Sequence, residues 1–211
     1  MDVSLWLTFV AASTALLLIP GPTVLLVLSY AVSQGRRVAV ATALGVAFGD
    51  LIALTAALAG LGALIAASAT AFTILKWIAA VYLLWLGWGM LRRAGESPAL
   101  MPGSAPPDGV SARAVFRHAA IVTALNPKTV GFFVAFVPQF IRPDAPVLPQ
   151  GAVIVATFVG LAAANALAYA LLADRLRVRL ARPSVIRWLM RGGGVALMGM
   201  GAATALMRRA T

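Results

Sequence analysis

Six hydrophobic runs, each long enough to cross a lipid bilayer, constrain this chain more than any other feature. About 20 apolar residues cross a hydrocarbon core of roughly 30 Å. The runs span approximately residues 5–30, 38–66, 72–91, 119–141, 151–173 and 185–207. None shows the period-2 alternation of a barrel strand, so all are predicted to be helices. The sequence therefore predicts an all-α membrane protein with six transmembrane helices in a single polytopic domain, residues 1–211.

The composition points the same way. Of the residues, 62% are hydrophobic and only 11% are charged, whereas soluble domains are about 45–50% apolar and about 25% charged. The absence of cysteine excludes disulfides, thiolate metal sites and cysteine nucleophiles. The net charge of +11 comes mostly from arginines between the apolar runs. Because no basic stripe is interleaved with exposed aromatics, no nucleic-acid partner is expected.

The distribution of positive charge predicts the orientation. The first, third and fifth loops, with the adjacent span ends, hold twelve Lys and Arg residues, the opposite side holds four, and Lys128 lies inside a span. Positive charge favours the cytoplasmic side, which places the odd loops in the cytoplasm and both termini outside. Arg208 and Arg209 at the C-terminus oppose this orientation.

A segment rich in proline and glycine divides the chain into halves. Residues 95–109 contain four Pro and three Gly and cannot form a regular helix. The chain is thus organised as repeat 1 (about 1–93), a linker (about 94–112) and repeat 2 (about 113–211). Each half holds three spans, and three is an odd number, so the second half enters the membrane from the opposite side. This organisation allows two inverted three-helix repeats, a common plan for secondary transporters.

Helix-breaking residues occupy the first span of each half, which predicts broken helices 1 and 4. The first span contains Pro20-Gly21-Pro22, where two prolines remove backbone donors. The fourth contains Asn126-Pro127-Lys128, in which Asn suits a helix N-cap and Pro the first helical position. Matched breaks favour a binding site, because freed amides can face an anionic ligand. Ordinary proline kinks are the alternative.

Two opposite charges are predicted to lie deep in the membrane. Asp50 follows Arg37 by thirteen residues, about 20 Å along a helix. A carboxylate there costs at least ~2.5–3.5 kcal/mol, so Asp50 and Lys128 both need a protein-lined or water-lined shelter. An ion pair between them is geometrically plausible, and a purely structural pair is the alternative. Asn165 and Tyr169 either extend this polar lining or make ordinary interhelical hydrogen bonds.

Small residues predict where helices approach closely. Gly45 and Gly49 form a GxxxG pattern just before Asp50, and glycines at 192–194, 199 and 201 enrich the last span. Glycine allows two helix backbones to come close together.

Taken together, these motifs resemble the LysE/RhtB family of amino-acid exporters. The resemblance covers nearly the whole chain and rests on Pro20-Gly21-Pro22, Gly35, Gly45-x-x-x-Gly49-Asp50, Asn126-Pro127-Lys128, Phe132-Phe133 and Pro138-Gln139-Phe140. It implies a bacterial inner-membrane, multi-pass efflux protein for amino acids or their derivatives, driven by the proton gradient. The partners are then an amino-acid substrate, protons and membrane lipid; no cofactor is expected, and a homo-oligomer is left open.

The family motifs also imply the site. The expected substrate-binding residues are Pro20, Gly21, Pro22, Gly49, Asp50, Asn126, Pro127 and Lys128, to which the polar residues of the fifth span add Asn165 and Tyr169. Lys128, helped by the helix N-terminus, is expected to attract the substrate carboxylate. Asp50 is expected to face the substrate ammonium and to exchange it for a proton in the empty carrier.

Other function classes compete with an exporter. An intramembrane aspartyl protease needs two membrane carboxylates, and the chain has no GxSxG serine motif, so no enzymatic activity is expected. A metal-ion exporter would place several carboxylate, His or Cys side chains within the spans. A passive channel stays open as an alternative, and its transport would not depend on the proton gradient.

Overall fold

The computed structural model describes residues 1–19, 21–34, 38–67, 69–94, 110–142, 144–173 and 183–206. All the elements assigned in these residues are helices: α1 (Val3–Leu18), α2 (Pro22–Gln34), α3 (Ala39–Ala67), α4 (Ala69–Arg93), α5 (Ala112–Ala124), α6 (Pro127–Ala135), the 3-10 helix η2 (Val137–Phe140), α7 (Val147–Leu171) and α9 (Pro183–Leu206). The linker predicted at 95–109 lies outside the described residues.

The helices follow the six hydrophobic runs. The run 5–30 is divided into α1 and α2, and the run 119–141 into α5, α6 and η2, whereas each of the other four contains one long helix. The first and fourth spans are therefore broken, as the sequence predicts.

Length and composition show which described helices can cross a bilayer on their own. Three qualify, at Ala39–Gly60, Thr73–Arg92 and Val147–Leu171, and the bent pair of α1 and α2 makes a fourth if it is counted as one span. The break after α5 leaves α5 and α6 with only 13 and 9 residues, and α9 carries two arginines near its start. The protein is thus an all-helical membrane protein with two interrupted helical segments.

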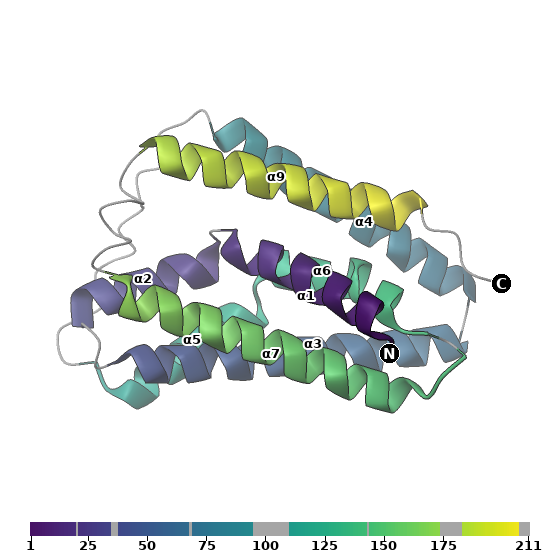
Figure 1. Ribbon diagram of the computed structural model, residues 1–211, viewed down its shortest axis with the longest axis horizontal. Helices are drawn as coiled ribbons and strands as arrows, with labels where there is room; N and C mark the ends of the chain where they lie inside the picture. The colour runs from purple at the N-terminus through teal and green to yellow at the C-terminus, as the bar shows by residue number, and fades with distance from the viewer. Residues whose placement is uncertain are drawn as a thin grey trace.

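The helices lie roughly along one common direction (Figure 1). The pair α4 and α9 runs along one edge of the bundle, α3, α5 and α7 run along the other, and α1 and α6 lie between them. The N-terminus and the last described turn of α9 lie at the same end of the bundle. A chain with an even number of passes has this property.

Glycines set the closest contact between α3 and α5. A Cβ added at Gly45 would lie 2.5 Å from the carbonyl oxygen of Phe116, and one added at Gly49 would lie 2.5 Å from that of Ala120. Only hydrogen at these positions allows the two backbones to touch. The close packing predicted from the GxxxG pattern is confirmed.

The glycines of α9 divide into two groups. Gly194 faces α4, where a Cβ would lie 2.7 Å from the carbonyl oxygen of Gly87. Gly192 and Gly199 have no neighbouring atom within 4 Å of an added Cβ. The prediction of close packing therefore holds for only part of this set.

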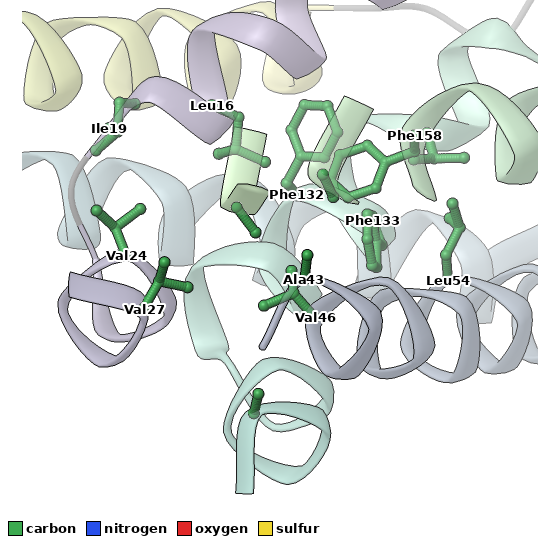
Figure 2. Packing of buried hydrophobic residues seen from close by; sticks show 14 of the residues in the cluster. Leu16, Ile19, Val24, Val27, Ala43, Val46, Leu54, Phe132, Phe133 and Phe158 are labelled. Atoms are coloured by element: carbon green, nitrogen blue, oxygen red, sulfur yellow. The ribbon is translucent and has the colours of Figure 1, made fainter. Parts of the chain in front are cut away.

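A buried aromatic cluster holds α6 inside the bundle. The side chains of Phe132, Phe133 and Phe158 are fully buried, and the rings of Phe133 and Phe158 meet edge to face with centroids 4.8 Å apart. Figure 2 shows these rings beside Leu16 and Leu54, which come from α1 and α3. Because α6 has only 9 residues, this packing fixes where its N-terminus lies.

Candidate functional site

The first helix break follows α1. Helix α1 ends at Leu18 with Ile19 as its C-cap, and α2 begins at Pro22. The axes of the two helices differ by 59°. Pro20, one of the expected site residues, lies outside the described residues.

The second helix break is capped as the sequence predicts. Asn126 is the N-cap of α6, and its Oδ1 accepts a hydrogen bond from the backbone N–H of Lys128 at 3.1 Å. Pro127 occupies the first helical position, where no backbone donor is needed. The helix therefore starts inside the bundle, and the side chain of its second residue, Lys128, reaches the end of α1.

Two threonines link this cap to the neighbouring helices. The Nδ2 of Asn126 donates to Thr23 Oγ1 at 3.1 Å, and Thr23 Oγ1 lies 3.4 Å from Thr123 Oγ1. Thr23 belongs to the first turn of α2, and Thr123 to the last turn of α5. The start of α6 is thus linked to the helix that follows the first break, α2, and to the helix that precedes the second break, α5.

Lys128 holds the end of α1. Its side chain is buried, and its Nζ donates to the carbonyl oxygens of Leu16 at 3.0 Å and Ile19 at 2.8 Å. The last carbonyls of a helix have no partner within the helix and carry partial negative charge. The buried Lys128 ammonium group donates hydrogen bonds to these carbonyls and balances their partial negative charge.

The fifth span completes this arrangement. Asn165 Nδ2 donates to the carbonyl of Leu17 at 3.3 Å, and the hydroxyl of Tyr169 donates to that of Leu18 at 3.4 Å. With the two bonds from Lys128, all four consecutive carbonyls at the end of α1 receive a side-chain donor from α6 or α7. Asn165 and Tyr169 therefore make interhelical hydrogen bonds at the same place where they line the cavity described below.

Asp50 approaches this group from α3. Its side chain is only 2% exposed, and its Oδ1 has no hydrogen-bond partner in the structure. The ion pair with Lys128 considered from the sequence is not formed, since no Lys128 nitrogen lies within 4.0 Å of an Asp50 oxygen in the described part of the chain. The physical reason is that the Lys128 ammonium is directed to the carbonyls of α1.

Asp50 and Lys128 nevertheless line one cavity. Its polar lining consists of Asp50, Lys128, Asn126, Thr23, Thr129, Asn165 and Tyr169, and its apolar lining of Leu17, Val24, Val27, Val46, Ala162 and Ala166. Figure 2 shows part of the apolar wall, where Val24 and Val27 lie on α2 and Val46 lies on α3. The volume of about 20 Å³ has room for about one water molecule. The structure therefore shows this site closed.

The other expected site residues lie around the cavity rather than in its wall. A Cβ added at Gly21 would lie 3.4 Å from Lys128 Nζ, so this glycine leaves room for the ammonium group. Gly49 contacts α5, and Pro22 and Pro127 each begin a helix. These residues shape the backbone that surrounds the polar groups.

Thr23 and Thr123 are site residues that the sequence reasoning missed. Threonine gives little signal within an apolar run, because its hydroxyl can bond the carbonyl of its own helix. Thr42 does so, with its Oγ1 2.7 Å from the carbonyl of Val38. The only available signal was the position of Thr23 and Thr123 within three residues of a predicted break.

The site combines buried groups of both charges with an apolar wall. It offers one carboxylate, one ammonium group, a helix N-terminus and an apolar wall. Within the described residues, no three His, Cys, Asp or Glu side chains gather in a metal-binding arrangement. Broken helices that meet at buried charges are typical of membrane transport proteins.

Comparison with known proteins identifies the family. The sequence profile of the LysE type translocators matches residues 14–208, and the chain belongs to this family. It is therefore a transport protein and not an enzyme. No solved structure matches the chain.

Several relatives share this sequence pattern. A homoserine/homoserine lactone efflux protein of Salmonella typhimurium is 33% identical over 205 residues, which cover 97% of this chain and 98% of the relative. A Vibrio cholerae membrane protein is 32% identical over 201 residues, or 95% and 96% of the two chains. A leucine efflux protein of Klebsiella pneumoniae is 33% identical over 145 residues, or 66% and 65%.

Proposed function

We propose that this protein exports amino acids or their derivatives across the bacterial inner membrane in exchange for protons. Relatives named for efflux of homoserine, homoserine lactone and leucine support the substrate class. The observation that carries the proposal is the pair of buried opposite charges, Asp50 and Lys128, lining one cavity without bonding each other. A free amino acid carries the complementary pair of charges.

Substrate entry changes the partners of Lys128. In the closed site its ammonium group is bonded to the carbonyls of Leu16 and Ile19. A carboxylate is a stronger acceptor than a carbonyl for a charged donor, so the substrate displaces one or both of them. The N-terminal amides of α6 add favourable partial charge at the same point. Loss of the two carbonyl contacts frees the end of α1, and the cavity enlarges to hold the substrate.

Asp50 is the group at which substrate is exchanged for a proton. The substrate ammonium neutralises the Asp50 carboxylate on the outward journey, and a proton neutralises it when the carrier returns empty. An uncompensated charge is costly inside the membrane, so the empty and deprotonated carrier returns slowly. A more acidic exterior loads Asp50 with protons faster, and this drives export.

The proposed architecture is six spans in two inverted repeats. Equivalent helices of the two halves pack against each other, α3 against α7 and α4 against α9. The break between α1 and α2 corresponds to the break between α5 and α6. Helix α1 begins, and the described part of α9 ends, at one end of the bundle (Figure 1), and the charge distribution favours the outside for this end.

Flux measurements on the purified protein in liposomes test this proposal. The vesicles are loaded with homoserine or leucine, and efflux is followed with and without an imposed pH gradient, for both gradient directions. Efflux should accelerate only when the compartment that receives the substrate is acidic, and a protonophore should abolish the acceleration. Efflux that ignores the gradient would indicate a passive channel, and no efflux of any amino acid would reject the substrate class.

A further inference from the structure

The first turns of α9 carry a basic, exposed face. Ser184, Arg187, Trp188 and Arg191 are spaced so that they lie on one side of the helix. They line a surface hollow of about 200 Å³, and Trp188 is 79% exposed. No residue of this hollow belongs to the polar site between the helix breaks.

This face points away from the protein. An adjoining side of α9 packs on α4, since a Cβ added at Gly201 would lie 2.9 Å from the carbonyl oxygen of Ala80. Figure 1 shows α9 with α4 at the edge of the bundle. The hollow therefore opens toward the surroundings of the membrane domain.

The side of α9 that carries Trp188 becomes apolar further along the helix. Gly192 and Gly199 have no atom within 4 Å of an added Cβ, and Val195 between them is 62% exposed. Gly199 follows Arg191 by eight residues, a distance of about 12 Å along the helix. The arginines at the start of α9 are thus followed by an exposed strip of small and apolar residues, Gly192, Val195 and Gly199.

We propose that this face of α9 binds an anionic phospholipid. The lipid phosphate lies between Arg187 and Arg191, whose planar guanidinium groups match phosphate oxygens. An acyl chain lies along Gly192, Val195 and Gly199, and Trp188 marks the level of the headgroups, where tryptophan is enriched. The proposal goes beyond amino-acid export but relies on α9 crossing the membrane.

Native mass spectrometry of the detergent-purified full-length protein tests the proposal. Wild-type protein is titrated with phosphatidylglycerol and with phosphatidylcholine, in parallel with the variant Arg187→Gln/Arg191→Gln. We expect selective binding of phosphatidylglycerol and about 30-fold weaker binding in the variant, because each surface arginine contributes about a factor of five toward an anionic lipid. Both side chains are exposed, so the variant should fold normally, and its thermal unfolding is measured alongside.

The matched control is Arg113→Gln/Arg117→Gln, which removes an exposed arginine pair with the same spacing from α5. It should keep the wild-type affinity. A second variant, Gly192→Leu/Gly199→Leu, places bulky side chains where the acyl chain is proposed to lie and should also weaken lipid binding. Equal affinity for both lipids, equal losses in the two arginine variants, or displacement of the lipid by inorganic phosphate would overturn the proposal. Because no substrate or gradient is involved, its failure is distinct from failure of the export function.

Discussion

The side-chain nitrogen of Lys128 lies 2.8 Å from the carbonyl oxygen of Ile19, so a residue at the second helix break binds the C-terminal end of α1, at the first break. This contact accounts for how a lysine can lie inside the bundle, because its charge is matched by the C-terminal carbonyls of α1. In the proposed export cycle, the carbonyls of α1 and the substrate carboxylate compete for Lys128. The predictions below separate its structural role from its proposed role in transport.

Replacing Lys128 with Met should reduce stability and abolish export. The carbonyl of Ile19 would lose the donor that Lys128 provides, whereas that of Leu16 would keep its bond from the backbone N–H of Ile19. A buried unsatisfied group costs about 1–3 kcal/mol. The control is Lys76→Met, which removes the other lysine of the chain, a residue that lies over the Trp77 ring at 5.3 Å. Thermal unfolding in detergent and efflux from liposomes give the two readouts. Equal effects of the two substitutions would contradict the assigned role of Lys128.

Replacing Asp50 with Asn should abolish proton-driven export without preventing membrane insertion. The amide mimics the neutral carboxyl group but cannot release a proton. Thr42→Val is the control on the same helix, because Thr42 is also buried and bonds only the carbonyl of Val38 among the bonds assigned to it. Efflux is measured with and without a pH gradient. If Asp50→Asn exports at the wild-type rate and still responds to the gradient, Asp50 has a structural role only.

Replacing Gly49 with Ala should destabilise the fold by about 1–3 kcal/mol, the usual cost of overpacking. The new methyl group would lie 2.5 Å from the carbonyl oxygen of Ala120 and would push α3 and α5 apart. Gly60→Ala is a matched control on α3, because no atom lies within 4 Å of its added Cβ. That control should unfold at the same temperature as wild type or higher. Calorimetry of the purified variants distinguishes the two.

Replacing Pro127 with Ala should weaken transport more than folding. Asn126 still caps α6, so the helix forms, but the fixed backbone angle that keeps its start separate from α5 is lost. Pro138→Ala is the comparison, since Pro138 begins the helical turn η2 away from the polar site. Initial efflux rates and unfolding temperatures are measured for both. Unchanged kinetics in Pro127→Ala would argue against a binding role for the break.

Both termini should face the outside of the inner membrane. The prediction follows from the unequal loop charges, and from the start of α1 and the last described turn of α9 lying at the same end of the bundle (Figure 1). A C-terminal epitope tag should then be accessible to a protease in spheroplasts with an intact inner membrane. A tag reached only after the inner membrane is permeabilised would reverse the orientation.

Local rules were sufficient to predict the helix breaks. Asn126 and Pro127 have strong preferences for the first positions of a helix, so the start of α6 was readable from adjacent residues. The GxxxG contact of Gly45 and Gly49 was readable for the same reason. Such features depend only on residues that lie within one or two helical turns of each other along the chain.

The partners of Lys128 were not predictable in this way. Its bonds to Leu16 and Ile19 join residues 112 and 109 positions apart, and they depend on how α1, α6 and α7 pack. From the sequence, Asp50 was the only acceptor of opposite charge at a similar depth, so the free carbonyls of the broken helix were overlooked. Backbone groups carry no sequence signature, although a predicted break shows that such groups must exist.

Ile19 joins the polar site to the outer pair of helices. Its carbonyl accepts the bond from Lys128, while its side chain packs where a Cβ on Gly193 would lie only 2.8 Å from Ile19 Cγ2. Any shift of this residue when Lys128 exchanges partners must therefore be accommodated by α9, and through Gly194 and Gly87 by α4. In the proposed transport cycle, a change of partners at the Lys128 ammonium group is therefore transmitted to two long helices through the contacts of Ile19.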